Sequence, residues 1–347
     1  MTLRQAQGGA ATISVIMAVY NGAALLPETI ASLQAQSFGD WELIAVDDCS
    51  KDDSVAVLKS FGDSRIRVIE SSQNGGPVVA RNRAFSEARG TYVAALDQDD
   101  LCLPERFAKQ IAFLDANPHV VLVSTAARML VEGRETSGNW LRGLTPGLID
   151  WLMLVQNPIV WSTVMFRAQP ASELVPFERP EMRYVEDFDF YHRIREHGLL
   201  AQIDEELLLY RSHAGGASQM FNAMMRDHAV ALLSEHAPDI APLLVSHVMA
   251  RDPVPDGATL ERLFRGIAGL RAGFEGDART LALVDREISR LWWRLCRAGV
   301  RSGRIALHQA LAGRPEAVPL ADANAADLVV SQMIGGVRAV RRSLTGS

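Results

Sequence analysis

Residues 91–100 read TYVAALDQDD, an apolar run that changes abruptly into a polar cluster. The run 91–96 is uncharged and continuous, which predicts a strand buried on both faces. The four residues that follow it are Asp97, Gln98, Asp99 and Asp100. Carboxylates this close repel one another in a dry site, and a divalent cation such as Mg²⁺ or Mn²⁺ removes that cost. The alternative is a turn that caps the helix expected near Pro104, because Asp is a favourable cap.

Upstream of this stretch, strand and helix patterns alternate along the chain. Apolar runs at 13–19 (ISVIMAV) and 41–46 (WELIAV) predict two more buried strands, and 65–69 predicts a more polar one. Helical patterns occupy residues 23–36, 53–61, 78–89 and 104–116. This β-α-β-α order predicts an α/β fold, with a mostly parallel sheet and helices on both of its faces.

Two further strand ends carry polar side chains. Tyr20 and Asn21 follow the first strand, and Asp47 and Asp48 follow the second. Ligands bind beyond the carboxyl ends of the strands in such sheets, so we expect these groups to share one edge with the 97–100 cluster. Taken alone, the two aspartates also suit a turn and a helix cap.

Three more segments carry groups suited to a ligand. Gly75 and Gly76 allow close backbone approach, and Arg81 near the next helix start suits a diphosphate or a base. Segment 185–190 (VEDFDF) sets carboxylates among aromatic rings, where burial raises a carboxyl pKa and favours proton acceptance. His213 suits a metal or a phosphate. Each segment also has a purely structural explanation, as a turn, a helix-dipole contact or a hydrogen-bonded histidine.

In this order, the segments resemble those of the family 2 glycosyltransferases. The matching stretches are SVIMAVYNG, LIAVDDCSKDDS, NGGPVVARNRAFSEARGTYVAALDQDD and YVEDFDFYHRI, within residues 13–220. The resemblance implies a GT-A (Rossmann-like) fold that moves a sugar from a UDP-, GDP- or dTDP-sugar to a carbohydrate or lipid-linked acceptor. It also implies a divalent metal, Mn²⁺ or Mg²⁺. The Gln-x-x-Arg-Trp motif of processive synthases is absent, which argues against a processive enzyme.

The same resemblance assigns roles to individual residues. It places seven residues at the nucleotide sugar: Ala18, Tyr20, Asp47, Asp48, Arg81, Asp97 and Gln98. Tyr20 and Asp48 would contact the nucleobase. Asp99 would be the main metal ligand, with His213 beside it. Asp187 would be the catalytic base of a single displacement that inverts the anomeric carbon.

The sequence changes character after residue 220. We expect a glycosyltransferase domain at 1–220 and a helical C-terminal extension at 221–347, rich in Ala, Leu and Arg. Residues 251–347 hold 15 arginines, no lysine and 10 acidic residues, with Trp292 and Trp293 among them. This composition predicts either a helical appendage packed on the first domain or a peripheral contact with an anionic membrane surface.

Composition bears on the remaining classes of protein. The net charge of -6 disfavours a nucleic-acid binder, and three distant cysteines indicate a reducing compartment. No apolar run reaches the ~20 residues of a transmembrane span. We therefore expect a cytoplasmic protein, or one at the inner face of the membrane. Two alternatives stay open: a sugar-nucleotide nucleotidyltransferase, although Tyr20-Asn21-Gly22 replaces its basic glycine-rich loop, and a non-catalytic carbohydrate-binding or scaffold protein.

Overall fold

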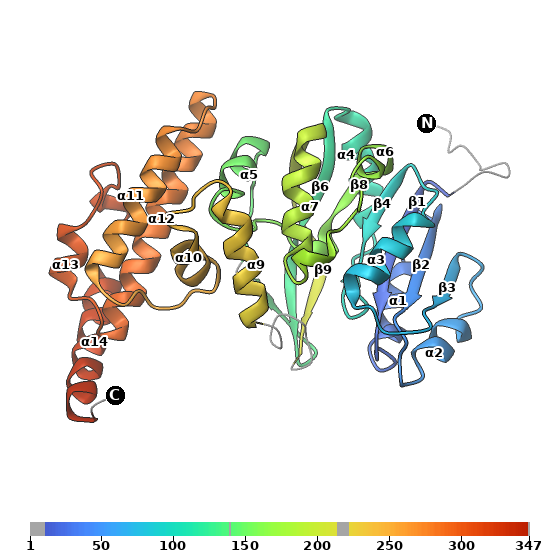
Figure 1. Ribbon diagram of the computed structural model, residues 1–347, viewed down its shortest axis with the longest axis horizontal. Coiled ribbons are helices and arrows are strands. Elements are labelled where there is room, and N and C mark those ends of the chain that lie inside the picture. The colour runs from blue at the N-terminus through green and yellow to red at the C-terminus, as the bar shows by residue number, and fades with distance from the viewer. Residues whose placement is uncertain (1–10, 139, 214–221, 346–347) are drawn as a thin grey trace. The chain divides into compact units, whose positions relative to one another are not determined.

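The computed structural model describes residues 11–138, 140–213 and 222–345 (Figure 1). The chain forms two compact units: Met1–Pro146 with Pro158–His228, and Gly147–Asn157 with Ala229–Ser347. This division differs from the single boundary expected at residue 220, because a segment from the middle of the chain joins the helical unit. The reason is its apolar character: Leu148, Ile149, Trp151 and Leu152 are all buried.

Among the described residues, the strands of the first unit form one nine-stranded sheet, in the order β3-β2-β1-β4-β8-β6-β9-β5, with β7 beside β6. The strands are β1 (Ile13–Val19), β2 (Trp41–Asp47), β3 (Ile66–Glu70), β4 (Tyr92–Ala95), β5 (Leu101–Cys102), β6 (Val120–Val131), β7 (Arg134–Ser137), β8 (Met165–Arg167) and β9 (Leu199–Ser212). Strands β3, β2, β1 and β4 are parallel neighbours, as the sequence predicts. Strand β8 runs antiparallel to β4 and β6, so the sheet as a whole is mixed.

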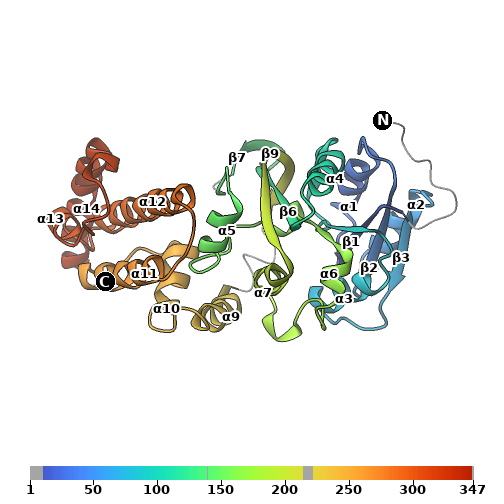
Figure 2. The ribbon, with the colours of Figure 1, turned by 90° about the horizontal axis from the view of Figure 1, so that it is seen from above.

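Helices cover the sheet on both faces. Those of the first unit are α1 (Leu26–Gln34), α2 (Ser54–Ser60), α3 (Pro77–Ser86), α4 (Arg106–Ala116), α6 (Ala168–Ser172) and α7 (Glu186–Ile194), with short 3-10 turns at η1 (Trp161–Thr163), η2 (Pro180–Met182) and η3 (Arg195–His197). Seen from above, α1 and α4 lie on one side of the strands and α3 and α6 on the other (Figure 2). Helix α3 packs on β1 and β2, with Pro77 in its first turn. The predicted α/β architecture is therefore confirmed.

The second unit is helical. It contains α5 (Pro146–Leu152), the later part of α9 (Asn222–Ser234), α10 (Ala241–Leu243), the π-helical turn η4 (Leu244–Met249), α11 (Gly257–Ala272), α12 (Ala278–Ser302), α13 (Leu307–Ala312), η5 (Leu320–Asp322) and α14 (Ala325–Thr345). The carboxylates of Asp256 and Asp277 cap α11 and α12 by accepting hydrogen bonds from backbone N–H groups three residues on. In the part of the chain that is described, every helix is too short or too polar to span a bilayer.

The tryptophans of the C-terminal extension belong to the core of this helical unit. Trp292 is fully buried and meets Phe264 edge to face, with ring centroids 4.7 Å apart. Trp293 is also buried, and its indole N–H donates to the carbonyl of Pro319 at 3.3 Å. These two rings are therefore not available to a membrane surface, because their apolar area is buried in the core, and a peripheral contact of the extension stays a prediction.

Candidate active site

The polar groups that follow β1, β2 and β4 meet at one edge of the sheet. Strand β1 lies between β2 and β4 and runs parallel to both, so the carboxyl ends of all three strands face the same way (Figure 1). Tyr20, Asp48 and Asp97 each stand one or two residues beyond one of these strands. This is the edge at which ligands bind in open α/β sheets.

Gln98 ties the loop after β1 to the loop after β4. Its side-chain oxygen accepts a hydrogen bond from the Tyr20 N–H at 2.9 Å, and its amide nitrogen donates to the Tyr20 carbonyl at 3.1 Å. A Cβ at position 22 would overlap this amide, so Gly22 leaves the space that Gln98 fills. The Tyr20 side chain stays 44% exposed. Gln98 thus fixes the backbone while the tyrosine ring remains accessible.

Asp48 shapes the glycine turn before α3. Its two carboxylate oxygens accept hydrogen bonds from the backbone N–H groups of Gly75, at 2.8 Å, and Gly76, at 2.7 Å. Gly76 has a φ of 86°, a conformation that favours glycine. The neighbouring Asp47 is buried, and its Oδ2 accepts from the Ser50 N–H at 3.1 Å. Among the described residues, the buried Asp47 Oδ1 has no hydrogen-bond partner.

Asp99 and His213 stand in direct contact. The imidazole Nε2 of His213 lies 2.8 Å from Asp99 Oδ2. The end of β9 is held there because Arg211 binds the acidic cluster twice, with its N–H on Asp100 Oδ1 and its Nε on the carbonyl of Asp99, each at 2.9 Å. The structure therefore brings together the two residues predicted to ligate a metal.

The chemistry of this pair fits a divalent cation. A carboxylate and an imidazole both suit Mn²⁺, and Mg²⁺ or Mn²⁺ is commonly held by one or two carboxylates plus substrate phosphates. Across residues 11–138, 140–213 and 222–345, no group of three or more His, Cys, Asp or Glu side chains is arranged to hold a metal. The described residues thus offer the pair Asp99 and His213, and oxygens of the substrate and of water would fill further positions.

Burial sets the protonation of the neighbouring carboxyl groups. It raises the pKa of Asp97 to about 6, although the guanidinium of Arg81 lowers it. It also raises the pKa of Asp100 well above its ordinary value, and the charges of Asp99 and Asp97 raise it further. A bound cation would favour the ionised forms of such groups, since opposite charge lowers a carboxyl pKa.

Arg81 forms the centre of a second cluster. Its Nε donates to both carboxylate oxygens of Glu178, at 3.0 and 2.9 Å, and its NH2 donates to Glu186. Its NH1 lies 3.7 Å from Asp97 Oδ1, and its guanidinium lies over the Trp161 ring, 5.1 Å from the centroid. Burial lowers the pKa of Arg81, but the three carboxylates raise it above its ordinary value. One buried cation therefore links the strand-end cluster to the start of α7.

Glu178 also belongs to this cluster, although no sequence pattern points to it. This carboxyl is fully buried, and burial raises its pKa to about 8 although Arg81 lowers it. Asn82 holds the backbone of the same residue: its amide donates to the Glu178 carbonyl and its oxygen accepts from the Glu178 N–H, both at 2.8 Å. Arg81 of α3 therefore binds the side chain of Glu178, and Asn82 binds its backbone. Glu178 stands outside any recognisable motif, so only the structure reveals it.

The acidic segment of α7 divides into two kinds of carboxylate. Glu186 binds Arg81, and the fully buried Asp189 accepts from Nε of Arg179, at 2.9 Å, and of Arg193, also at 2.9 Å. Asp187 is half-buried and accepts from the Phe188 N–H at 2.7 Å. The flanking carboxylates are therefore paired with arginines in the interior, whereas Asp187 as a residue is only half-buried.

Tyr191 lies close to the acidic groups of both clusters. Burial raises the pKa of its hydroxyl well above the ordinary value, and the negative charges of Asp187, Glu178 and Asp97 raise it further. The hydroxyl is buried and has no hydrogen-bond partner among the described residues. Asp187 thus lies in the same electrostatic environment as the Arg81 cluster and the strand-end carboxylates.

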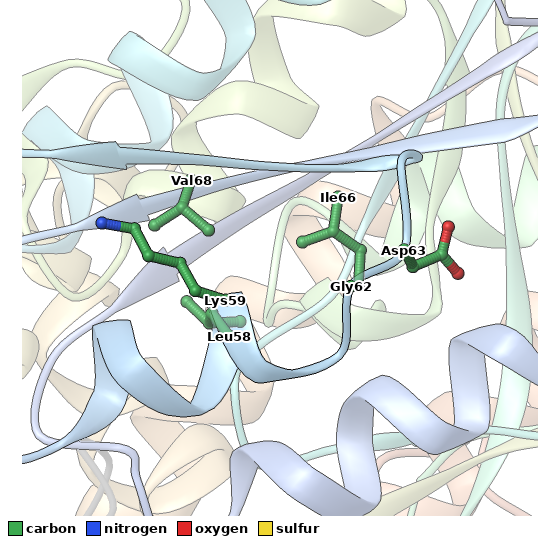
Figure 3. Close-up of a pocket in the computed structure, with 6 residues that line it drawn as sticks. All are labelled: Leu58, Lys59, Gly62, Asp63, Ile66 and Val68. Carbon is green, nitrogen blue, oxygen red and sulfur yellow. The ribbon is translucent and has the colours of Figure 1, made fainter.

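A hollow beside α2 lies apart from this site. It is lined by residues of α2, of β3 and of the turn between them (Figure 3): Leu58, Lys59, Gly62, Asp63, Ile66 and Val68. Its charged residues are already paired, Lys59 with Glu70 at 2.6 Å and Asp63 with Arg65 at 2.7 Å. We assign the hollow no part in the chemistry.

The chain is similar to known glycosyltransferases in sequence. Residues 14–174 match the model of the glycosyl transferase family 2. The putative glycosyltransferase EpsE of Bacillus subtilis is 33% identical over 191 residues, which cover 54% of this chain and 67% of EpsE.

Two solved structures are similar in fold. S. aureus TarS 1-349 in complex with UDP-GlcNAc has a TM-score of 0.54 at 19% identity, covering 96% of this chain and 92% of that one. The mannosyltransferase PcManGT from Pyrobaculum calidifontis, in complex with GDP-Man and Mn²⁺, has a TM-score of 0.52 at 15% identity, covering 97% and 91%. The expected GT-A fold and the expected glycosyltransferase class are thereby confirmed. The alternative of a sugar-nucleotide nucleotidyltransferase is not supported. The chain belongs to glycosyl transferase family 2 and is a glycosyltransferase of the GT-A fold.

Proposed function

We propose that this glycosyltransferase is metal-dependent and inverting, and that it uses a UDP-, GDP- or dTDP-sugar. Its acceptor would be a hydroxyl of a carbohydrate or a lipid-linked sugar, in the synthesis of a cell-surface polysaccharide. The observation that carries this proposal is the link through Arg81, whose guanidinium contacts both Asp97 at the strand ends and Glu186 beside Asp187. Donor and acceptor groups would thereby meet at one site.

The donor nucleotide would lie across the ends of β1, β2 and β4. The exposed Tyr20 ring offers a face on which a nucleobase can stack, and the buried Asp47 would support this loop by accepting from the Ser50 N–H. Asp48 keeps further acceptor capacity, since each carboxylate oxygen can accept more than one hydrogen bond. The backbone near Ala18 would contribute from the end of β1. Gln98 would act by holding Tyr20 in place.

Asp99 and His213 would hold the divalent cation, because they are the carboxylate and imidazole already in contact at this edge. When bound, such an ion stabilises the charge that builds on the departing diphosphate. Asp97, beside them, would face the ribose of the donor. Arg81 is buried and engaged by carboxylates, so we propose that it supports the donor through Asp97 and not by direct contact.

Asp187 would be the general base. Its carboxylate would take the proton of the acceptor hydroxyl as that oxygen attacks the anomeric carbon from the side opposite the diphosphate. One direct displacement inverts the anomeric centre and needs no second carboxylate as nucleophile, unlike a retaining glycosidase. The ion pairs of Glu186 and Asp189 with arginines would fix the first turn of α7 and so aim Asp187.

A cytoplasmic place of action is part of the same proposal. In the described chain, Cys49, Cys102 and Cys296 are all free thiols. Free thiols are typical of a reducing compartment, which supports the location expected from composition.

A donor screen tests the proposed function. The protein would be incubated with UDP-, GDP- and dTDP-sugars, with and without Mn²⁺, and release of nucleoside diphosphate would be measured. We expect one nucleotide class to be hydrolysed and only with metal, and the Asp99→Asn variant to lose most of the metal effect while remaining folded. Equal turnover of the preferred donor after metal chelation would overturn metal dependence. Once an acceptor is known, NMR of the product tests inversion of the anomeric centre.

A further inference from the structure

Arg183 lies beside the glycine turn that Asp48 holds. A Cβ at position 76 would lie 2.9 Å from a terminal nitrogen of the Arg183 guanidinium, so this group packs directly on the backbone of Gly76. The N–H of the same glycine donates to Asp48 Oδ2 at 2.7 Å. The acceptor oxygens of Asp48 and the donor nitrogens of Arg183 therefore both lie next to Gly76.

Arg183 is held differently from the other arginines of this loop and of α7. Arg179 and Arg193 both pair with the carboxylate of Asp189. The guanidinium of Arg183 instead lies over the Tyr184 ring, 5.0 Å from the centroid, and in the described chain no carboxylate pairs with it. Of its three nitrogens, Nε alone is buried without a partner among the described residues, so the two terminal nitrogens remain available to a ligand.

The backbone around Arg183 fixes the position of its side chain. The Arg183 carbonyl accepts a hydrogen bond from Nδ1 of His228 at 2.8 Å, and Tyr184 has a φ of 73°. Helix α7 begins two residues later at Glu186, which binds Arg81. The guanidinium is thus already placed beside Gly76, and a ligand that bound it would have little chain to order.

The place of Arg183 along the sheet edge decides which part of the donor it would meet. Asp48 follows β2, and the glycine turn lies between β3 and α3. Strand β1 separates β2 from β4, so the ends of β2 and β4 are about 10 Å apart. Asp99, the proposed cation ligand, follows β4. Arg183 therefore lies at the proposed nucleobase end of the site and not at the diphosphate end.

The bases of UDP-, dTDP- and GDP-sugars share one feature. Uracil, thymine and guanine each present a ring N–H directly beside a carbonyl, whereas cytosine and adenine present a bare ring nitrogen beside an amino group. A carboxylate only accepts hydrogen bonds and a guanidinium only donates them. A carboxylate and a guanidinium side by side therefore suit the first kind of edge and oppose the second.

We propose that Asp48 and Arg183 together bind this edge of the donor base, with Asp48 accepting from the ring N–H and Arg183 donating to the carbonyl. Arg183 is then a specificity-determining residue that favours uridine, thymidine and guanosine donors over cytidine and adenosine donors. The inference rests on the proposed function and deepens it, because it names the class of base and the residue that selects it.

Calorimetric titration of the full chain tests this inference with two probes. One is the nucleotide that binds best among UDP, dTDP and GDP. The other is its thio analogue, in which sulfur, a weak acceptor, replaces the carbonyl oxygen beside the ring N–H. The parent should bind the thio analogue roughly tenfold more weakly. Arg183→Ala should bind the natural nucleotide roughly tenfold more weakly than the parent does, and should no longer distinguish the two probes.

Arg83→Ala is the matched control and should bind both probes as the parent does, because Arg83 is an exposed arginine of α3 paired with Glu87. Arg183→Met keeps much of the packing without any donor, and it replaces Arg183→Ala if urea unfolding shows that the alanine variant is not folded.

Two outcomes would overturn the inference alone. Equal losses for both probes in the Arg183 variant would assign the arginine to the diphosphate, and unchanged binding of the natural nucleotide would remove it from the site. A parent that binds none of the three nucleotides would instead overturn the proposed function.

Discussion

Asp187 differs from its two acidic neighbours in what holds it. Glu186 and Asp189 are bound by arginines in the protein interior, so their replacement removes a buried ion pair. Asp187 is half-buried, and its Oδ1 accepts from the Phe188 N–H at 2.7 Å. Replacement of Asp187 should therefore lower mainly turnover, whereas replacement of Glu186 or Asp189 should lower mainly stability.

Asp187→Asn should lower turnover by ~10²–10⁴-fold and leave donor affinity unchanged, because the base acts on the acceptor proton in the transition state. Steady-state kinetics and calorimetric titration of the nucleotide measure the two effects. Asp189→Asn is the comparison: it should lower the free energy of unfolding because Arg179 and Arg193 lose their partner. Near-normal turnover of Asp187→Asn would remove it from the role of base.

Glu178 makes stability depend on pH. Its carboxyl pKa rises from the ordinary 4.5 to about 8 on folding, mainly through burial. The folded protein therefore binds this proton more tightly than the unfolded chain does. The resulting stabilisation is complete below about pH 4.5 and is lost as the pH rises toward about 8.

Glu178→Gln should flatten this part of the stability profile, since the amide cannot ionise. Urea unfolding at several pH values between these limits measures the change. The parent should lose free energy of unfolding over the window by an amount on the order of a few kcal/mol, and the variant should lose less. An identical slope in both proteins would show that another group is responsible.

At the scale of elements, α3 connects three separate parts of the first unit. Through Arg81 and Asn82 it holds the loop at Glu178, the start of α7 and the end of β4. The partners of Arg81 lie between 16 and 105 positions from it in the chain, and they meet on one turn of α3. The helix is thus a brace for the site as well as a cover for β1 and β2.

Arg81→Ala should destabilise the protein by ~3–5 kcal/mol, because it leaves the buried Glu186 carboxylate without its cation and the buried Glu178 carboxyl without its hydrogen-bond donor. Arg83→Ala on the same helix is the control. Arg83 is exposed and pairs with Glu87 at 2.8 Å, so its loss should cost ~0–1 kcal/mol. Chemical unfolding of the two variants gives the comparison, and similar losses in both would argue against the brace.

Some strands of the sheet can be predicted from the sequence, and the pairing of others cannot. Strands β1, β2 and β4 are buried on both faces, so their apolar runs stand out, and parallel pairing brings the polar residues after them together. The antiparallel placement of β8 and the pairing of β6 with β9 depend on contacts between distant segments. Glu178 was missed for the same reason, since its partner Arg81 lies 97 positions away and leaves no local pattern.

At the scale of the whole molecule, the two units are interleaved along the chain. The expected boundary at residue 220 follows a change in composition, but composition gives no sign that Gly147–Asn157 belongs with the later helices. Helix α5 carries four buried apolar residues, Leu148, Ile149, Trp151 and Leu152. Its Gly147 lies against the side chain of Thr280 on α12. The first unit is therefore not a continuous piece of chain.

A protein cut after Arg251 should be insoluble for this reason. The cut removes α12, whose Thr280 lies against Gly147 of α5, and we expect the buried Leu148, Ile149, Trp151 and Leu152 to become exposed, at ~1.5–3 kcal/mol of lost burial each. Soluble yield and gel filtration of the truncated chain measure the outcome. A second truncation that also replaces these four residues by polar ones should recover solubility. A soluble, nucleotide-binding product from the simple cut would show that the first unit is self-sufficient.

The hydrogen bonds between Gln98 and the backbone of Tyr20 carry an evolutionary consequence. Because the amide of Gln98 occupies the space that a side chain at position 22 would need, the two positions are not free to vary independently. Relatives that keep a long amide at 98 should keep glycine at 22. Relatives with a shorter residue at 98 should tolerate a larger one at 22 and should hold the tyrosine loop by other contacts. An alignment of relatives would test whether the two positions covary in this way.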